Sequence, residues 1–266
     1  MSLRHKRLVA GWFFAFVIFG GEARAADLTV MISGGLNSAY RALAPEYEKS
    51  SGNTLVTVEG ASMGANPTAI PARLDRGEPA DVVIVLREAM DKLVAKGQVE
   101  KESVVDLGIG HIAMAVKAGA PKPDIRTVDS FRNALLAAKS AAYTDSAGGI
   151  YLQNVLFKRL GIEKQMTAKS KMISGLPVGP GLARGEYEIA FQQLSELKSV
   201  QGIEIVGLIP DVVQKATTFS AGIATRAANP QDGREHIHLL ASPAAFPAIE
   251  SSGLEPAQLH AEASIK

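Results

Sequence analysis

The chain contains no cysteine, which excludes disulfide bonds and thiolate metal ligands from its chemistry. It also has no excess of either charge, because 28 Lys and Arg residues stand against 27 Asp and Glu residues, without a long basic run. Nucleic acid is therefore not an expected partner. The 266 residues, of which 47% are hydrophobic, suffice for one large domain or two smaller lobes with cores that need no disulfide.

Several signatures of catalytic and cofactor chemistry are also missing. There is no Walker sequence and no Gly-x-Gly-x-x-Gly, so nucleotide binding fits poorly. Ser33, Ser62 or Ser146 could be a nucleophile, but no histidine is obviously placed in the sequence to serve one of them. The spacing His-x-x-x-His and a dense carboxylate loop are absent, and we expect neither a metal nor another cofactor. We interpret His111, His236, His238 and His260 as structural or surface residues.

The apolar run at residues 8–20 is too short to span a membrane. It follows basic residues and precedes Ala23-Arg24-Ala25, which is the order of parts in a secretory signal with an A-x-A cleavage site. We therefore expect residues 1–25 to be removed and the mature chain to begin at Ala26; an uncleaved anchor is the alternative. Since no cysteine is available for lipid attachment, the mature protein is expected to be free in the bacterial periplasm.

Short apolar strands alternate with amphipathic stretches along the rest of the chain. This rhythm predicts an α/β protein with a parallel sheet covered on both faces. The expected strands are residues 28–32, 54–58, 81–86, 111–116, 141–143, 188–191, 203–208 and 219–225. The expected helices are residues 36–50, 67–75, 87–96, 128–138 (with Asp129 as N-cap), 150–160, 233–241 and 243–251. We expect two lobes: residues 26–112 with 208–266, and residues 113–207.

Turns rich in Ser and Gly follow strands in both expected lobes. In open α/β sheets, ligands bind beyond the carboxyl ends of strands, where helix N-termini and free backbone N–H groups favour anions. Ser and Gly also occur in turns for conformational reasons alone, but their recurrence in both lobes favours an anion site in a cleft between them. The residues expected to line that cleft are Ser33, Gly34, Ser62, Met63, Ser146, Gly149, Val178 and Gln192.

Five stretches resemble the periplasmic molybdate/tungstate-binding proteins of ABC transporters, which have the type II periplasmic binding-protein fold. They are LTVMISGGLNSAYRALAPEYEKSSG, GASMG, RLDRGEPADVVI, AAYTDSAGGIYLQNVLFKRLG and ARGEYEIAFQQLSEL. The resemblance implies that fold, with two lobes and a ligand cleft between them. Departures occur at the ligand positions: Gly35 stands before Leu36 where the receptors offer Ser, and Gln192 stands where they offer Tyr. These departures indicate a larger anion, such as a polycarboxylate.

The chain is also similar to the bacterial aconitate isomerases, a periplasmic family related to those receptors, in SMG, AIPARLDRGEPADVV, APKPDI, YTDSAGGIYL, PVG and FQQLSELK. This resemblance implies an isomerase that interconverts trans- and cis-aconitate by allylic proton transfer without a cofactor. Such chemistry needs carboxylate anchors and one group that takes and returns a proton.

The sequence leaves the identity of that proton carrier open. Asp145 and Tyr151 are the first candidates, with Tyr143 and Glu78 behind them, although Asp145 also suits a helix cap. Arg73 could pair with a substrate carboxylate or could be a solvated helix residue. The alternative function is a periplasmic receptor for a molybdate-like oxyanion or a polycarboxylate, and only that alternative implies a membrane permease as partner.

Overall fold

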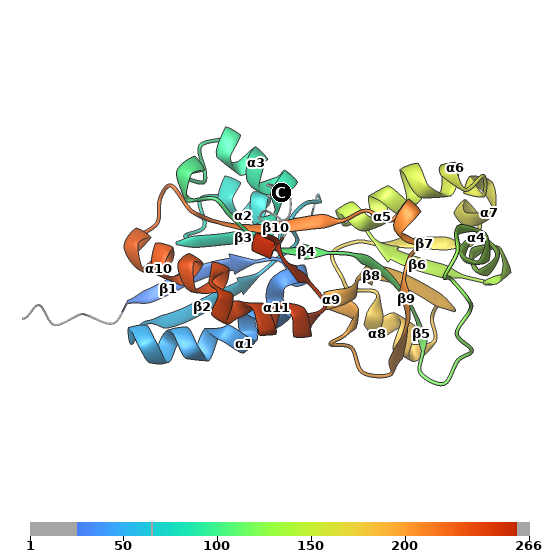
Figure 1. Cartoon of the computed structure of the whole chain (residues 1–266). Coiled ribbons are helices and arrows are strands. Elements are labelled where there is room, and N and C mark those ends of the chain that lie inside the picture. Colours follow the sequence, from blue (N-terminus) through green and yellow to red (C-terminus); the bar gives the residue numbers. More distant parts are fainter. Residues whose placement is uncertain (1–25, 65, 260–266) are drawn as a thin grey trace, which may run out of the picture.

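A computed structural model describes residues 26–64 and 66–259 of the protein. The expected signal at residues 1–25 therefore lies outside the described residues. Two sheets, each covered by helices, form two lobes that lie side by side (Figure 1). Within the described residues, none of the helices combines the length and the apolar character needed to cross a membrane.

The sheet of the first lobe has six strands in the order β11-β4-β10-β3-β1-β2. Its strands are β1 (Asp27–Ile32), β2 (Thr54–Glu59), β3 (Val82–Leu86), β4 (Val105–Gly110), β10 (Thr217–Ile223) and β11 (Glu255–Pro256). β1 is parallel to β2 and β3, whereas β10 is antiparallel to β3 and β4. The sheet is thus mixed rather than parallel throughout, because β10 enters it on the return from the second lobe.

Helices cover both faces of this sheet (Figure 1). They are α1 (Gly34–Ser51), α2 (Ile70–Asp75), α3 (Arg87–Ala95), α10 (Pro230–Ala241) and α11 (Phe246–Ser252), with short 3-10 turns η1 (Lys101–Ser103) and η4 (Pro243–Ala245). In α1, Leu36, Tyr40, Leu43 and Tyr47 are buried at helical spacing, which is why this segment packs one face on the sheet. The helix ends where Gly52 adopts a left-handed conformation.

The sheet of the second lobe has five strands in the order β7-β6-β8-β5-β9. Its strands are β5 (Ile112–Lys117), β6 (Ala141–Thr144), β7 (Ser170–Ile173), β8 (Ile189–Gln193) and β9 (Ile203–Leu208). Its helices are α4 (Val128–Ala137), α5 (Ala147–Tyr151), the π-helix η2 (Leu152–Leu156), α6 (Phe157–Arg159), α7 (Glu163–Thr167), α8 (Gly179–Arg184) and α9 (Leu194–Leu197). One apolar core lies under α4 to α7, and a smaller one lies under α8 and α9.

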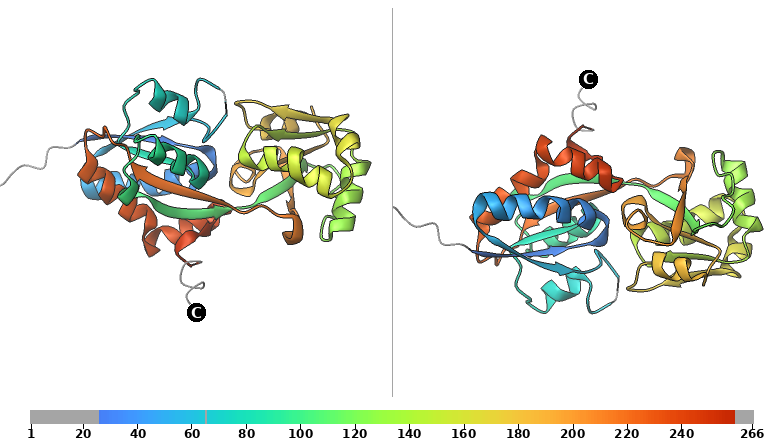
Figure 2. Two further views of the ribbon diagram at one scale, coloured as in Figure 1. Left: turned by 90° about the horizontal axis from the view of Figure 1, so that it is seen from above. Right: turned by 90° about the horizontal axis from the view of Figure 1, so that it is seen from below.

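Two extended segments join the lobes (Figure 2). The chain leaves the first sheet at Gly110 and enters the second at Ile112, and it returns between Leu208 and Thr217 through the 3-10 turn η3 (Asp211–Val213). Ile112 pairs with Gln193, and Leu208 pairs with Ala113. Both residues therefore belong to the second sheet, one position beyond the boundary expected from the sequence, because the pairing continues to the ends of the crossing strands.

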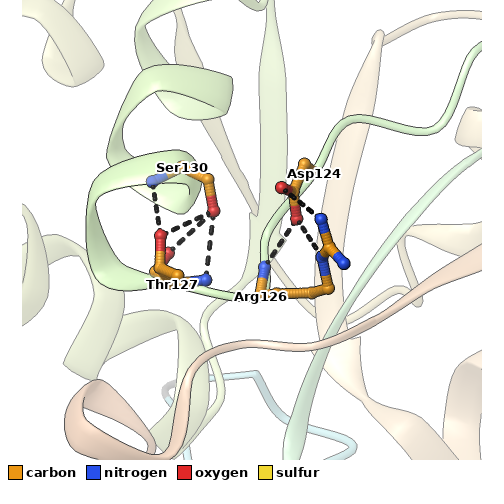
Figure 3. A network of polar contacts seen from close by, with 4 residues as sticks. All are labelled: Asp124, Arg126, Thr127 and Ser130. Atoms are coloured by element: carbon orange, nitrogen blue, oxygen red, sulfur yellow. Dashed lines mark hydrogen bonds and ion pairs between the residues drawn. The ribbon is translucent and has the colours of Figure 1, made fainter.

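The N-terminus of α4 differs from the expectation. Thr127, not Asp129, is the N-cap, and its hydroxyl accepts a hydrogen bond from the backbone N–H of Ser130 at 3.1 Å. The Ser130 hydroxyl in turn accepts from the Thr127 backbone N–H at 3.0 Å, which completes a capping box (Figure 3). Asp124 and Arg126 form an ion pair just before the cap. This pair lowers the pKa of the Asp124 carboxyl to about 2.

Candidate functional site: a cavity between the lobes

A cavity of about 680 Å³ lies between the lobes and is lined by residues from both. Seven of the residues expected from the sequence line it: Ser33, Gly34, Ser62, Met63, Asp145, Ser146 and Gln192. They come from the carboxyl ends of β1, β2, β6 and β8, which are far apart in the sequence. The topology thus brings strand ends from both sheets to one place, as expected for ligand sites in such folds.

The first lobe contributes two buried serines. Ser33 is the N-cap of α1, and its side-chain oxygen is buried without a hydrogen-bond partner. The Ser62 hydroxyl accepts a hydrogen bond from the backbone N–H of Leu86 at 3.0 Å, so its own proton is available to the cavity. A buried polar atom without a partner costs free energy unless a ligand or water satisfies it. Both hydroxyls are therefore suited to bind an anion.

Packing explains why a glycine, Gly35, stands where the molybdate receptors offer Ser. A Cβ atom at this position would overlap the ring of Phe219, which comes from β10 and also lines the cavity. A serine could not be placed here without moving Phe219. The aromatic ring thus occupies space at the first turn of α1.

In the second lobe, the Asp145 carboxylate is hydrogen-bonded to a neighbouring loop. The Ser174 hydroxyl donates to Asp145 Oδ2 at 2.5 Å, and the Gly175 N–H lies 3.4 Å from Asp145 Oδ1. The neighbouring Ser146 is the N-cap of α5, and its hydroxyl lies 2.8 Å from Thr144 Oγ1. Asp145 therefore positions the Ser174–Gly175 segment beside the cavity.

Loops of the two lobes approach each other across the cavity. A Cβ atom at Gly64, in the first lobe, would lie 3.5 Å from Asp145 Oδ2. A Cβ atom at Gly175, in the second lobe, would overlap the side-chain amide of Asn66. Both glycines have positive φ. A side chain at Gly175 would collide with Asn66, and the positive φ disfavours a side chain at either glycine.

Gln192 and Gln193 end β8, and both are buried. Gln192 Oε1 accepts a hydrogen bond from the Val178 N–H at 3.1 Å, which turns the amide nitrogen of Gln192 toward other partners. Gln193 Nε2 lies 3.2 Å from Thr217 Oγ1, and its Oε1 is buried without a partner. Val178 does not line the cavity itself; it acts behind Gln192 by fixing the amide.

Other residues expected at the site lie elsewhere or behind it. Tyr151 lies at the end of α5, where its ring faces the connection between β9 and β10. Its hydroxyl donates to the Val213 carbonyl at 2.8 Å. Arg73 donates to Glu78 Oε2 at 2.7 Å and is not among the cavity-lining residues. Gly149 is buried behind the cavity, where a Cβ atom would overlap the Thr144 carbonyl oxygen. Tyr151 and Arg73 are thus satisfied by protein partners away from the cavity.

Glu196 is a cavity residue that the sequence reasoning missed. It lies on α9, and burial raises the pKa of its carboxyl to about 7 in spite of hydrogen bonds with the Gln192 side chain and the Gln193 backbone. The residue is half-buried, and its carboxyl lies against Gly34 at the first turn of α1. The only available signal was its place in the FQQLSELK stretch.

The other charged residues of the cavity are Arg41, Glu59 and Asp145. Arg41 and Glu59 form an ion pair, and Asn37 donates to Glu59 Oε1 at 2.9 Å. Over residues 26–64 and 66–259, no group of three or more His, Asp and Glu residues is arranged to hold a metal ion. The binding groups of the cavity are hydroxyls, amides and backbone N–H groups.

The model of one protein family matches residues 28–255: the bacterial extracellular solute-binding proteins. The chain belongs to this family. Solved structures with a similar fold include the periplasmic molybdate-binding protein of Azotobacter vinelandii, with a TM-score of 0.69 and 19% identity over 85% of this chain and 98% of that chain. The sulfate-binding protein SubI from Mycobacterium tuberculosis H37Rv gives a TM-score of 0.67 and 15% identity over 87% of each chain. These likenesses confirm the expected two-lobed binding-protein fold.

A relative of much higher sequence similarity carries an enzyme name. The aconitate isomerase of a Pseudomonas species is 52% identical to this chain over 229 residues, which are 86% of this chain and 87% of that protein. Its identity far exceeds that of the receptors above. Both kinds of protein thus occur on the same two-lobed scaffold.

Proposed function

We propose that this protein is an aconitate isomerase that interconverts trans- and cis-aconitate without a cofactor. The observation that carries the proposal is the 52% identity, over 86% of the chain, to a protein of that name. At that identity, spread over almost the whole chain, the fold and the surroundings of the cavity are expected to be shared.

The cavity supports a small polycarboxylate as substrate. Its volume of about 680 Å³ lies within the range usual for small-molecule sites, roughly 300–1,000 Å³. The hydroxyls of Ser33 and Ser62 and the first turn of α1 provide donors from the first lobe. Ser146 and Gln192 provide donors from the second lobe. Donors on opposite walls suit an anion with carboxylates at both ends.

The chemistry needs only a proton carrier and these donors. Aconitate is propene-1,2,3-tricarboxylate, with a methylene next to a double bond. Removing a methylene proton gives a dienolate-like anion, and returning a proton to the former vinyl carbon moves the double bond. The new double bond can have either geometry. Preorganised donors around the carboxylates stabilise the charge that develops in the intermediate.

The same proposal places the protein in the periplasm. Membership in an extracellular solute-binding family supports export. We propose that residues 1–25 act as a cleaved signal peptide, on the order of basic, apolar and A-x-A segments.

The direct experiment follows both isomers by NMR in deuterated water, with purified protein, trans-aconitate and no added cofactor. We expect cis-aconitate to accumulate to equilibrium and deuterium to enter the methylene. Calorimetry should show binding of trans-aconitate and weak or no binding of molybdate, since Gln192 stands where a receptor of that type offers Tyr. Tight binding of trans-aconitate without isomer formation would instead assign the protein as a polycarboxylate receptor.

A further inference from the structure

The carboxyl groups of the cavity differ in how far they are engaged. Glu59 is paired with Arg41 and Asn37. Asp145 accepts hydrogen bonds from Ser174 and Gly175. Glu196, in contrast, has no cationic partner within the part of the chain that the structure describes. Glu59 is held ionised by a cation and Asp145 is engaged with the Ser174–Gly175 loop, so Glu196 is the carboxyl best suited to take and return a proton.

Glu196 also lies where an anchored substrate would be within reach. A Cβ atom at Gly34 would lie 2.5 Å from Glu196 Oε1, so the carboxyl lies directly against the first turn of α1. The Ser33 hydroxyl on α1 and the Ser195 hydroxyl on α9 are both buried without a partner and line the same cavity. Unpartnered hydroxyls beside a carboxyl indicate that a polar ligand fits between α1 and α9.

We propose that Glu196 is the proton carrier of the isomerisation. In this assignment, which rests on the proposed function, a carboxylate oxygen of Glu196 takes one proton from the substrate methylene. The C–H electron pair enters the dienolate, and the same carboxyl then returns a proton to the former vinyl carbon. One C–H bond breaks and one forms, so substrate and product have the same oxidation state and no other reactant is consumed.

The surroundings of Glu196 explain why a carboxyl could do this work near neutral pH. Burial raises its pKa to about 7, which makes the ionised form a stronger base than an exposed carboxylate. The charged groups on neighbouring elements have partners of their own. On α1, Arg41 is paired with Glu59; before β5, His111 lies 3.2 Å from Glu255; and on α9's own end, Lys198 donates to the Ser251 carbonyl. Asp145, across the cavity, is a further negative charge.

A bound polycarboxylate would add negative charge beside Glu196. Like charges raise the pKa of a carboxyl further, so binding of aconitate near pH 7 should take up a proton at this residue. The ionised form that acts as the base is then populated in the complex as the pH rises through this raised pKa. Binding and protonation are then linked, and the linkage can be measured without following the reaction. Calorimetric titrations in buffers of different ionisation enthalpy report the number of protons taken up.

The test compares Glu196→Gln with wild type, and with Glu88→Gln as a matched control. Glu88 is an exposed residue of α3 that pairs with Lys92 and does not line the cavity. We expect Glu196→Gln to lower kcat by about 10²–10⁴-fold, the usual contribution of a general acid–base group. Deuterium entry into the methylene should fall in parallel, the limb near pH 7 in kcat/KM should disappear, and proton uptake on binding should be lost. Glu196→Asp, which keeps a carboxyl, should retain part of the turnover, and Glu88→Gln should match wild type.

Three other results would overturn the assignment. The Glu196→Gln variant could fold, bind trans-aconitate and keep the wild-type turnover and pH profile. That result would exclude Glu196 as the proton carrier and leave the isomerase function intact. A loss of turnover in Asp145→Asn alone, with the same fold and affinity, would give the role to Asp145. Wild-type protein that binds trans-aconitate without converting it would contradict the proposed function and the role of Glu196 together. Thermal unfolding of each variant checks that the fold is retained.

Discussion

At the scale of single residues, His236 is the clearest buried group outside the cavity. It is fully buried on α10, against Tyr40 and Tyr47 at ring-centroid distances of 5.7 and 4.4 Å. Neither ring nitrogen has a hydrogen-bond partner. Burial lowers the pKa of His236 from 6.5 to about 4. The imidazole is therefore neutral in the folded protein at the pH where the unfolded chain begins to bind a proton.

This gives the first prediction. Above pH 6.5 the imidazole is neutral in both states, and its contribution to stability is complete. As the pH falls from 6.5 to 4, only the unfolded chain takes up the proton, so the folded state loses up to about 3 kcal/mol from this group. Below pH 4 the loss levels off. His236→Leu should remove this part of the pH dependence in urea unfolding experiments.

The matched control is His238→Leu, two residues further along the same helix at an exposed position. It should leave the difference in unfolding free energy between pH 7 and pH 5 as in wild type. If His236→Leu showed the same pH dependence as wild type, the buried imidazole would not be the source of the acid sensitivity.

At the scale of secondary-structure elements, the sequence predicted most of the strands that build the site. Residues 203–208 were placed correctly, and β1 and β3 differ by single positions, because continuous apolar runs between turns are a strong signal. β4 was missed because its sequence VDLGIG contains an Asp and two glycines. β7 was missed because it is a short edge strand, SKMI, whose middle residues are exposed. The short helix α9, and with it Glu196, carries too few residues to show periodicity.

The cap of α4 illustrates a different limit. Thr127 and Asp129 are both residue types that cap helices, and the sequence does not choose between them. The choice depends on the backbone, since Thr127 has the extended conformation, with φ −118° and ψ 161°, that a cap requires. The Asp124–Arg126 ion pair lies just before this cap (Figure 3).

The second prediction concerns this cap. Thr127→Ala removes the hydroxyl that accepts from the Ser130 N–H, and it should lower the free energy of unfolding by about 1 kcal/mol. Asp129→Ala, which removes only a charge in the first turn, should cost less, about 0.3–1 kcal/mol at low salt. Urea denaturation of the two variants makes the comparison. A larger loss for Asp129→Ala would restore the assignment made from sequence alone.

At the scale of the whole molecule, the site exists only because strand ends from two sheets meet. The sequence predicted which turns would contribute, because their small residues suit helix N-termini. It could not predict that Tyr151 turns toward Val213 or that Arg73 pairs with Glu78. Val213 is 62 residues from Tyr151 in the sequence. Glu78 is only five residues from Arg73, but the two residue types alone do not show that they pair with each other. The arrangement of Glu196 against Gly34 likewise needs both lobes to be in place.

Export of the whole protein is the third prediction. Material from a periplasmic extract should begin at Ala26, because cleavage is expected after the Ala23-Arg24-Ala25 sequence. N-terminal sequencing or intact-mass measurement decides the point. Replacing Ala25 by a bulky residue such as Phe should block cleavage and leave the longer chain. A periplasmic protein that still carried its first residues would show that the segment serves as an anchor.

The fourth prediction joins ligand binding to the stability of both lobes. A ligand that binds only the folded protein between the two lobes should stabilise it by mass action. At a ligand concentration of 100 Kd, the free energy of unfolding should increase by about 2.7 kcal/mol, and the unfolding temperature should rise with it. Trans-aconitate and its saturated analogue propane-1,2,3-tricarboxylate should both stabilise the protein, since both offer three carboxylates to the donors of the cavity. Only trans-aconitate can lose an allylic proton and isomerise.

Molybdate should give a much smaller shift in unfolding temperature, because Phe219 lies against Gly35 at the first turn of α1 and Gln192 stands where a molybdate receptor offers Tyr. Thermal unfolding with each anion at equal ionic strength measures the order, and a shift by molybdate larger than that by either tricarboxylate would show that the cavity has kept the specificity of a small-oxyanion receptor.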